Sequence, residues 1–301
     1  MQSIRLYKYH RINEHLFELL SLNAFYCCTF SDLNDPLEGK INLNRTFLNN
    51  FFHKVGNWEL PYPNMLWQEF VTQCEENMET LYYLDKHKVR LHLIDLYELY
   101  ELPEKEKTNI ILSAPILKQE FTRILMNHYN YRVVSFSCFL KKDKEKEKLM
   151  WSYYSGASKG VRLTFNLPIP VKSNFDGLEN ILFESVLYDS KPPKLNTEKE
   201  FIECIRFKYD VWRNESEYRL LIRNRTGLGF KQSYLKEVTF GLNVEEKVRI
   251  SVIRLCKMLK YNCAFKYLEY KDDKLKERLI DKRLIDIYVN LRDKTEFRIE
   301  I

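Results

Sequence analysis

Apolar and polar residues alternate with a period of two near both ends of the chain. Residues 4–9 and 131–139 show this pattern most clearly, and it predicts strands with one face against a core. β-branched and aromatic runs bounded by turn residues predict further strands at 24–30, 161–165, 181–188, 218–222, 238–240, 263–270 and 285–291.

Other segments repeat their apolar residues at the helical spacing. Asn13 and Thr197 are suited to cap two of these helices. Outside the middle of the chain, we expect helices at 14–21, 198–211 and 245–261. The middle, 41–130, is polar, aromatic and interrupted by prolines, with helical spacing at 67–84, 89–100 and 116–129. We interpret 41–130 as a helical insertion within a single domain that spans 1–301.

Strands and helices do not alternate in a regular βαβ order, which favours an α+β fold with a mixed or antiparallel sheet. The chain contains neither the GxGxxG pattern of dinucleotide-binding folds nor the GxxxxGK[ST] pattern of phosphate-binding loops. A doubly wound fold is therefore not expected.

Composition is that of a globular protein, with 45% hydrophobic and 30% charged residues in 301. The net charge of +6 is compatible with an anionic partner but does not establish one. Seven cysteines without CxxC spacing indicate free thiols and no zinc site. No apolar run is long enough to span a bilayer. We expect a cytoplasmic protein without a membrane segment or a metal.

The segment 208–222 is the one most suggestive of chemistry. Two carboxylates, Glu215 and Glu217, follow Trp212 and precede the run of strand formers 218–222. In an extended chain, residues at i and i+2 share a face. Such a pair is either a solvated, arginine-paired edge or the reactive end of a site. An exposed pair of Glu217 with Arg219 would contribute less than about 1 kcal/mol.

Four other motifs could also carry chemistry, but each of them, taken singly, can be explained by a purely structural role. They are a basic first strand, a turn, a serine-containing strand and an aromatic segment followed by glycine. In order, they are Tyr7-Lys8-Tyr9-His10, Asn34-Asp35-Pro36-Leu37-Glu38, Ser135-Phe136-Ser137, and Leu149 to Tyr154 with Gly160.

Taken together and in this order, the motifs resemble a bacterial domain family. That family has an LYKY-type strand, an F-x-D-P-x-E turn, an SFS strand, an LMW-x-x-Y motif and a late W-x-x-E-x-E-Y-R motif. The resemblance covers about 1–40 and 131–270 and leaves the helical middle uncovered. Tyr153 stands where the family often has histidine, so a role for that histidine is lost or replaced.

The family is similar to the ADP-ribosyltransferase superfamily, and it is associated with phage defence and toxin–antitoxin loci. This resemblance implies a split β-sandwich of mixed sheets and a toxin-like enzyme that uses NAD as a substrate. It implies that Glu217 orients the ribose and that Glu215 faces the acceptor. The implied NAD-binding residues are Lys8, Tyr9, His10, Asn34, Asp35, Ser135, Ser137, Tyr154 and Arg219.

The chemistry explains these residue types. Nicotinamide leaves NAD without an acid because the departing ring is already cationic, and the transition state is an oxocarbenium ion. A carboxylate on the ribose 2′-hydroxyl stabilises that charge, a second acid deprotonates the acceptor, and an aromatic ring such as Tyr154 stacks on nicotinamide.

The acceptor is not encoded in these residues. The basic balance and the lysine-rich segment 141–148 favour RNA or DNA, although interspersed acids give 141–148 the character of a solvated surface. An antitoxin protein is a candidate partner. The alternative function is a non-catalytic, nucleic-acid-binding or interaction module on the same scaffold. A nuclease is poorly supported because no clustered metal ligands are present.

Overall fold

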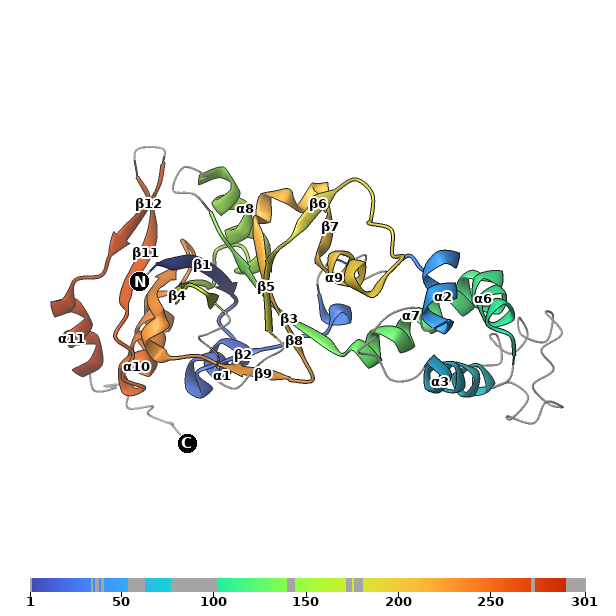
Figure 1. Ribbon diagram of the computed structural model, residues 1–301. Coiled ribbons are helices and arrows are strands. Elements are labelled where there is room, and N and C mark those ends of the chain that lie inside the picture. The colour runs from blue at the N-terminus through green and yellow to red at the C-terminus, as the bar shows by residue number, and fades with distance from the viewer. Residues whose placement is uncertain are drawn as a thin grey trace, which may run out of the picture.

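An eight-stranded mixed sheet organises the described part of the chain (Figure 1). The structure is a computed structural model that describes residues 2–33, 35, 38, 41–53, 63–76, 102–139, 144–171, 175, 181–271 and 274–290. The α+β class expected from the sequence is confirmed. The predicted helix at 89–100 and part of the one at 67–84 lie outside the described residues.

The strand order of the large sheet is β12-β11-β10-β4-β1-β3-β8-β5. Neighbouring strands are antiparallel except β10 and β11, which are parallel and are connected through the helix α10 (Glu246–Met258). The strands are β1 (Ser3–His10), β3 (Tyr131–Ser137), β4 (Val161–Pro168), β5 (Ile181–Ser185), β8 (Glu217–Arg223), β10 (Leu235–Phe240), β11 (Ala264–Lys271) and β12 (Lys274–Leu279).

The sheet forks between β1 and β3. All eight residues of β1 pair with β4, whereas only Tyr7 pairs with β3, opposite Ser137. Beyond that pair the two strands separate, and β3 continues along β8 through seven pairs. The sheet therefore consists of two well-bonded halves joined at one point.

Two short ladders flank the sheet. One is antiparallel, between β2 (Ala24–Tyr26) and β9 (Gly227–Gly229), and the other is parallel, between β6 (Leu187–Asp189) and β7 (Phe207–Tyr209). Short 3-10 helices are η1 (Phe30–Asp32), η3 (Asp210–Glu215) and η4 (Gln232–Tyr234). The ladder of β6 and β7 lies beside the start of β8, because Val186 donates its N–H to the Glu217 carbonyl at 3.0 Å.

Helices gather at both ends of an elongated molecule (Figure 1). At one end, α10 (Glu246–Met258) and α11 (Lys282–Asn290) lie beside β11. At the other end are α2 (Arg45–Phe52), α3 (Pro63–Glu76), α6 (Glu104–Ser113) and α7 (Pro115–Tyr129). Between these groups are α1 (Glu14–Leu22), α8 (Lys144–Tyr154) and α9 (Glu198–Arg206).

The described residues form two large apolar cores. One lies under the sheet and includes Leu6, Phe165 and Val252. The other fills the group of α2, α3, α6 and α7 but also takes in Val133 of β3 and Leu221 of β8. The described helices of 41–130 are thus packed onto the same sheet that carries β1.

Several boundaries differ from the sequence-based expectation. The predicted strand at 285–291 is wrong, because its described residues, 285–290, belong to α11, where Ile285 and Tyr288 face the core at helical spacing. The predicted helix at 198–211 ends at Arg206, since the next residues pair with β6. The predicted strand 181–188 is divided at Val186. The predicted strand 24–30 ends at Tyr26.

Both predicted N-caps are confirmed. The Asn13 side chain accepts a hydrogen bond from the Leu16 N–H and caps α1, which ends at Asn23 in the left-handed conformation. Thr197 caps α9 in the same way.

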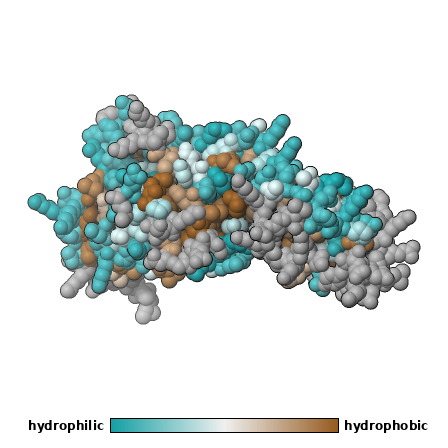
Figure 2. Space-filling view, in the orientation of Figure 1, coloured by the Kyte–Doolittle hydropathy of each residue, from teal (hydrophilic) through white to brown (hydrophobic). Residues whose placement is uncertain are grey.

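Among the described helices none is long and apolar enough to cross a membrane. On the face shown in Figure 2, hydrophobic side chains gather over the middle of the molecule, between hydrophilic margins.

Gly160, between α8 and β4, has no room for a side chain. A Cβ there would lie 2.0 Å from the His10 carbonyl oxygen. We expect Gly160→Ala to lower the free energy of unfolding by about 3 kcal/mol or more, at the upper end of overpacking costs, in urea denaturation. Gly227→Ala is the matched control, because its Cβ would lie 4.0 Å from the nearest atom, the Phe25 carbonyl oxygen. Equal losses in both variants would contradict this explanation.

Candidate functional site

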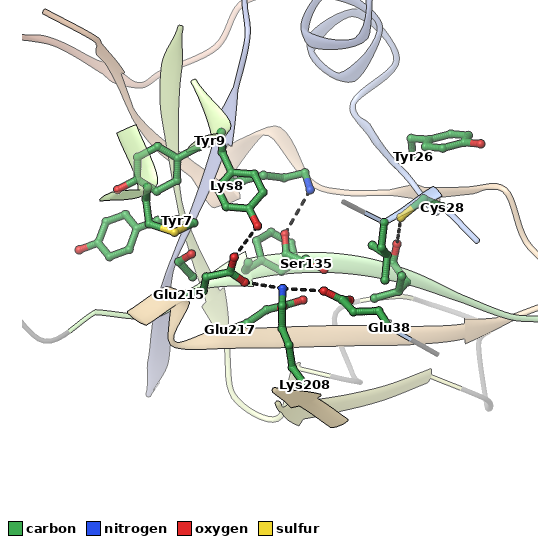
Figure 3. A pocket seen from close by; sticks show the side chains of 16 residues that line it. Tyr7, Lys8, Tyr9, Tyr26, Cys28, Glu38, Ser135, Lys208, Glu215 and Glu217 are labelled. Carbon is green, nitrogen blue, oxygen red and sulfur yellow. Dashed lines mark hydrogen bonds and ion pairs between the residues drawn. The ribbon is translucent and has the colours of Figure 1, made fainter. Parts of the chain in front are cut away.

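A pocket of about 180 Å³ lies at the fork between β1 and β3 (Figure 3). Its walls come from β1, β3, α8, β7, the end of η3, the start of β8 and four residues nearer the N-terminus, Tyr26, Cys28, Leu33 and Glu38. The lining residues are Tyr7, Lys8, Tyr9, Tyr26, Cys28, Leu33, Glu38, Val133, Ser135, Phe136, Ser137, Met150, Tyr154, Lys208, Glu215 and Glu217.

Glu215 and Glu217 converge on this pocket, but not by sharing a strand face. Glu215 ends the 3-10 helix η3, and Glu217 begins β8. Ser216 between them is left-handed, with φ of 46° and ψ of 51°. The Ser216 carbonyl accepts the Cys138 N–H at 2.9 Å, and the Tyr188 hydroxyl accepts the Glu217 N–H at 2.9 Å. The strand-face explanation is therefore wrong, although both acids do reach one site.

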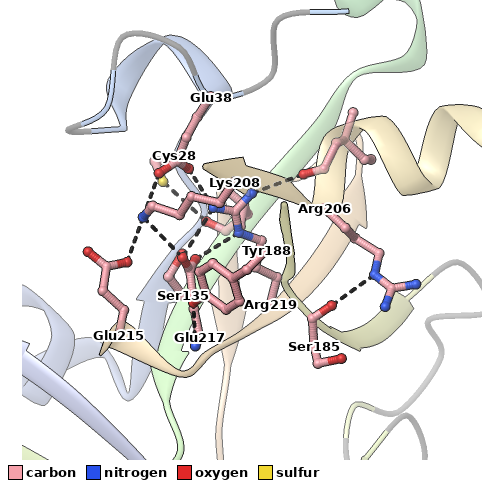
Figure 4. Close-up of polar contacts among 12 residues, drawn as sticks. Cys28, Glu38, Ser135, Ser185, Tyr188, Arg206, Lys208, Glu215, Glu217 and Arg219 are labelled. Carbon is pink, nitrogen blue, oxygen red and sulfur yellow. Dashed lines mark hydrogen bonds and ion pairs between the residues drawn. The ribbon is translucent and has the colours of Figure 1, made fainter. Parts of the chain in front are cut away.

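The Lys208 ammonium group joins three buried carboxylates (Figure 4). Its Nζ lies 2.6 Å from Glu38 Oε1, 2.6 Å from Glu215 Oε2 and 3.3 Å from Glu217 Oε2. The Trp212 ring lies over the same nitrogen, with 5.2 Å to the ring centroid. All four charged groups are at least nine-tenths buried.

Arg219 closes the network from beneath the pocket. Its Nε donates to Glu217 Oε1 at 2.7 Å, its Nη2 contacts Glu38, and its Nη1 donates to the Ile205 carbonyl at 3.0 Å. The side chain is fully buried. The exposed ion pair of Glu217 with Arg219 that the sequence allowed is thus replaced by a buried one.

The network holds three carboxylates and two cations, so it carries one excess negative charge when all are ionised. Burial raises the pKa of Glu215, and the neighbouring Glu217 adds to this against the opposing charge of Lys208. Burial also opposes ionisation of Glu217, but Arg219 and Lys208 outweigh it and hold the pKa of Glu217 at about 2. The pKa of Glu215 therefore lies above that of Glu217, so Glu215 takes up a proton at higher pH.

Tyr154 reaches Glu215 from α8. Its hydroxyl donates to Glu215 Oε1 at 2.5 Å. Burial, with the negative charge of Glu215, raises the pKa of Tyr154, so the phenol stays protonated. The helix is held against β1 by Trp151, which meets Tyr9 edge to face at 5.2 Å. Arg162 of β4 pairs with Glu147 of the same helix.

The opposite wall of the pocket is apolar and carries one amine. The half-buried Lys8 donates to the Ser135 carbonyl at 3.1 Å and lies 5.6 Å from the Phe136 ring centroid. Burial lowers the pKa of Lys8. Within the described residues no carboxylate lies within ion-pair distance of it. Cys28 and Tyr26 stand beside this wall, and Tyr26 is 65% exposed at the rim.

Most of the residues chosen from the sequence meet in the pocket. Its lining includes Glu215, Glu217, Lys8, Tyr9, Ser135, Ser137 and Tyr154. Arg219 lies behind Glu217 and acts on the site through it.

The remaining three choices are not among the described lining residues. His10 lies at the end of β1, and burial, together with the charge of Lys8, lowers its pKa to about 3, so the ring is neutral at pH 7. Asp35 is buried, and its carbonyl accepts the Glu38 N–H at 3.0 Å, which shapes the turn that presents Glu38. Asn34 lies outside the described residues.

Lys208 and Glu38 are the main residues that sequence reasoning missed as members of the site. In the sequence, Glu38 stands out only as the last residue of the turn motif 34–38, and Lys208 only as the first residue of the segment 208–222. The sequence around Lys208 does indicate a buried ion pair, because a lysine in a short apolar strand must be paired when it is buried. Its partners are 7, 9 and 170 positions away, so their identity required the fold.

Comparison of the chain with protein-family models, with curated proteins and with solved structures finds no match. Within the described part of the chain, no group of three or more histidine, cysteine, aspartate or glutamate residues could hold a metal ion.

We expect Arg219→Met to lower the free energy of unfolding by about 3–5 kcal/mol, because it leaves Glu38 and Glu217 buried with one cation fewer. Arg5→Met is the matched control. Arg5 pairs with Glu237 at 2.6 Å, but its side chain is 45% exposed, so its loss should cost less than about 1 kcal/mol. Denaturant titration of both variants measures the difference. Similar losses in the free energy of unfolding would contradict the claim that the buried ion pairs of Arg219 stabilise the fold more than an exposed pair does.

The low pKa of Glu217 makes stability depend on acid pH. The folded pKa of about 2 lies below the ordinary 4.5, so this stabilisation is present above pH 4.5 and is lost as pH falls toward 2. We expect the stability difference between wild type and Glu217→Gln to shrink by on the order of 3 kcal/mol across that window. Glu145→Gln, at an exposed residue, should keep the wild-type slope. A difference that does not vary with pH would refute the assignment.

Proposed function

We propose that the chain is an NAD-dependent ADP-ribosyltransferase, a toxin-like effector that transfers ADP-ribose to a macromolecular acceptor. The observation that carries the proposal is the pair Glu215 and Glu217 in one pocket, with the pKa of Glu217 held low by its cations and the pKa of Glu215 raised by burial. Reactions that need a charge-stabilising carboxylate and a separate acid–base group use such unequal pairs.

In the proposed reaction the bond between C1′ of the ribose and the nicotinamide nitrogen breaks. Its electron pair leaves with nicotinamide, which becomes neutral, and positive charge develops on the ribose. Glu217 accepts a hydrogen bond from the ribose 2′-hydroxyl and stabilises that charge. The low pKa of Glu217 suits this role, because the carboxylate stays ionised throughout the physiological pH range.

An oxygen or nitrogen of the acceptor then forms a bond with C1′, and its proton passes to Glu215 as general base. The Tyr154 hydroxyl, bonded to Glu215 at 2.5 Å, fixes the orientation of that carboxylate. The Tyr154 ring is available to stack on nicotinamide. The excess negative charge of the network favours both the cationic ring and the ribosyl cation.

The pocket suits the reacting end of NAD and not the whole dinucleotide. About 180 Å³ is less than the roughly 300 Å³ at which pockets begin to enclose drug-sized ligands. We therefore place nicotinamide and its ribose inside, with the phosphates toward Lys8, which has donors to spare. The fork between β1 and β3 supports assignment to the split β-sandwich of the superfamily.

The acceptor is proposed to be a nucleic acid. Tyr26 at the pocket rim is 65% exposed, and Tyr153, which meets Trp212 edge to face, is 56% exposed. Exposed rings of this kind stack on unpaired bases with little regard to sequence. The net charge of +6 favours a polyanion. An antitoxin protein would restrain such an activity in the cell.

The test is incubation of the purified protein with adenylate-labelled NAD and single-stranded RNA, single-stranded DNA or cell lysate. We expect nicotinamide release with transfer of label, and a decrease of at least about 100-fold in Glu217→Gln, the size of effect seen when a charge-stabilising group is removed. Glu237→Gln is the control, because Glu237 is partnered by Arg5 and Lys266 and does not line the pocket.

If label appears on protein in the lysate but on neither oligonucleotide, the acceptor is a protein side chain and not a nucleic acid. The proposed enzymatic activity would be contradicted by two results together. The wild-type protein would release no nicotinamide with any acceptor, and its expression would slow growth no more than expression of Glu217→Gln. Retained oligonucleotide binding would then favour the non-catalytic binding module.

A further inference from the structure

Two lysines face the pocket, and they use their donors differently. An ammonium group has three N–H donors. Lys208 has three carboxylates within 3.3 Å of its Nζ, from the turn at Glu38, from η3 and from β8. Among the described residues, Lys8 donates to one acceptor, the Ser135 carbonyl. Lys208 is therefore saturated by the protein, whereas Lys8 keeps donors for a ligand.

Saturation makes Lys208 unsuited to bind substrate. Its side chain is 5% exposed, and the Trp212 ring covers its nitrogen. It nevertheless lines the pocket, because it stands between the two acids that face the proposed substrate. Its influence on a reaction would have to pass through Glu215 and Glu217.

We propose that Lys208 is a positioning residue of the proposed transfer, which holds the Glu215 and Glu217 carboxylates in place and keeps Glu215 able to act as a base near neutral pH. The inference rests on the proposed function for its catalytic meaning. The expected effect of Lys208 on the pKa of Glu215 can be tested on the protein without NAD.

The groups that face Glu215 come from several elements. Lys208 comes from β7, Tyr154 from α8, Glu217 from β8 and Tyr188 from β6, with Glu38 on the far side of Lys208. Burial and the charge of Glu217 raise the pKa of Glu215, while the charge of Lys208 and its hydrogen bond lower it. Of the two cations in the network, Lys208 is the one that contacts Glu215 directly. Without it, Glu215 would hold its proton to higher pH.

The chain offers a matched control in Lys266. That residue also bridges two acids, Glu237 at 2.8 Å and Glu277 at 3.3 Å, but it lies on β11 and does not line the pocket. The experiment compares wild type, Lys208→Met, Lys208→Arg and Lys266→Met. Transfer of label from adenylate-labelled NAD to single-stranded RNA, the step in which Glu215 acts as base, is measured from pH 5 to pH 10, after thermal melting has shown that each variant is folded.

Because ionised Glu215 is the active form, the rate rises with pH through the pKa of Glu215. We expect Lys208→Met to move this rise upward by about one pH unit or more, which is tenfold in rate below the midpoint. At high pH the loss should be much smaller. Lys208→Arg should keep the wild-type position, and Lys266→Met should match wild type throughout. A loss in Lys208→Met that is equal at every pH, or an unmoved profile, would overturn the inference.

A second measurement separates this inference from the proposed function. Titration of carboxyl-labelled glutamate by carbon NMR reports Glu215 in the free protein, with the signal assigned from Glu215→Gln. The Glu215 midpoint should move upward in Lys208→Met whether or not NAD is turned over. If wild type is inert toward NAD, the proposed function fails and the NMR midpoint alone decides the role of Lys208. If Lys208→Met does not fold, Lys208→Met with Glu38→Gln removes one carboxylate as well, and the same midpoint is measured there.

Discussion

The contact of one ammonium group with three buried carboxylates is the interaction on which the site depends. Lys208 draws together the turn at Glu38, the end of η3 at Glu215 and the start of β8 at Glu217. Taking such charges out of water is costly unless every one is paired. Arg219 supplies the second cation, and together the two hold segments that are nearly two hundred residues apart in the chain.

The fork in the sheet gives this network an opening. β1 leaves β3 beyond the pair of Tyr7 with Ser137, and Ser137 lies opposite Glu217 at the start of β8, so the acids lie beside the pocket at this fork. The two sides of that pocket differ in chemistry: acids and Tyr154 lie on one, and Lys8 with apolar residues lies on the other. A ligand with a cationic ring at one end and phosphates at the other would match this division.

Local pattern was enough to predict much of the scaffold. Strand β1, helix α1 with its Asn13 cap and helix α7 follow from periodicity and capping chemistry, which act within a few residues. The α+β class follows from the order of such elements. The helix α11 was missed because its β-branched residues favour a strand, and its packing against α10 overrides that preference.

The site was predictable in its membership more than in its geometry. The conformation of Ser216 depends on Cys138 and Tyr188, which lie 78 and 28 positions away in the numbering, so no local rule indicates it. The pairing of Lys208 with Glu38 is likewise set by tertiary structure. Ordered motifs, read through a family resemblance, located the acids without explaining how they are held.

The central place of β1 has a consequence for synthesis in the cell. β1 is made before the other strands of the large sheet and lies between β4 and β3, whose residues emerge more than a hundred positions later. Lys208 and Glu217 emerge later still. The nascent chain therefore carries β1 unpaired until β3 and β4 have been made. The pocket is complete only after Glu217 has emerged from the ribosome, so a chain that terminates before that residue lacks the site altogether.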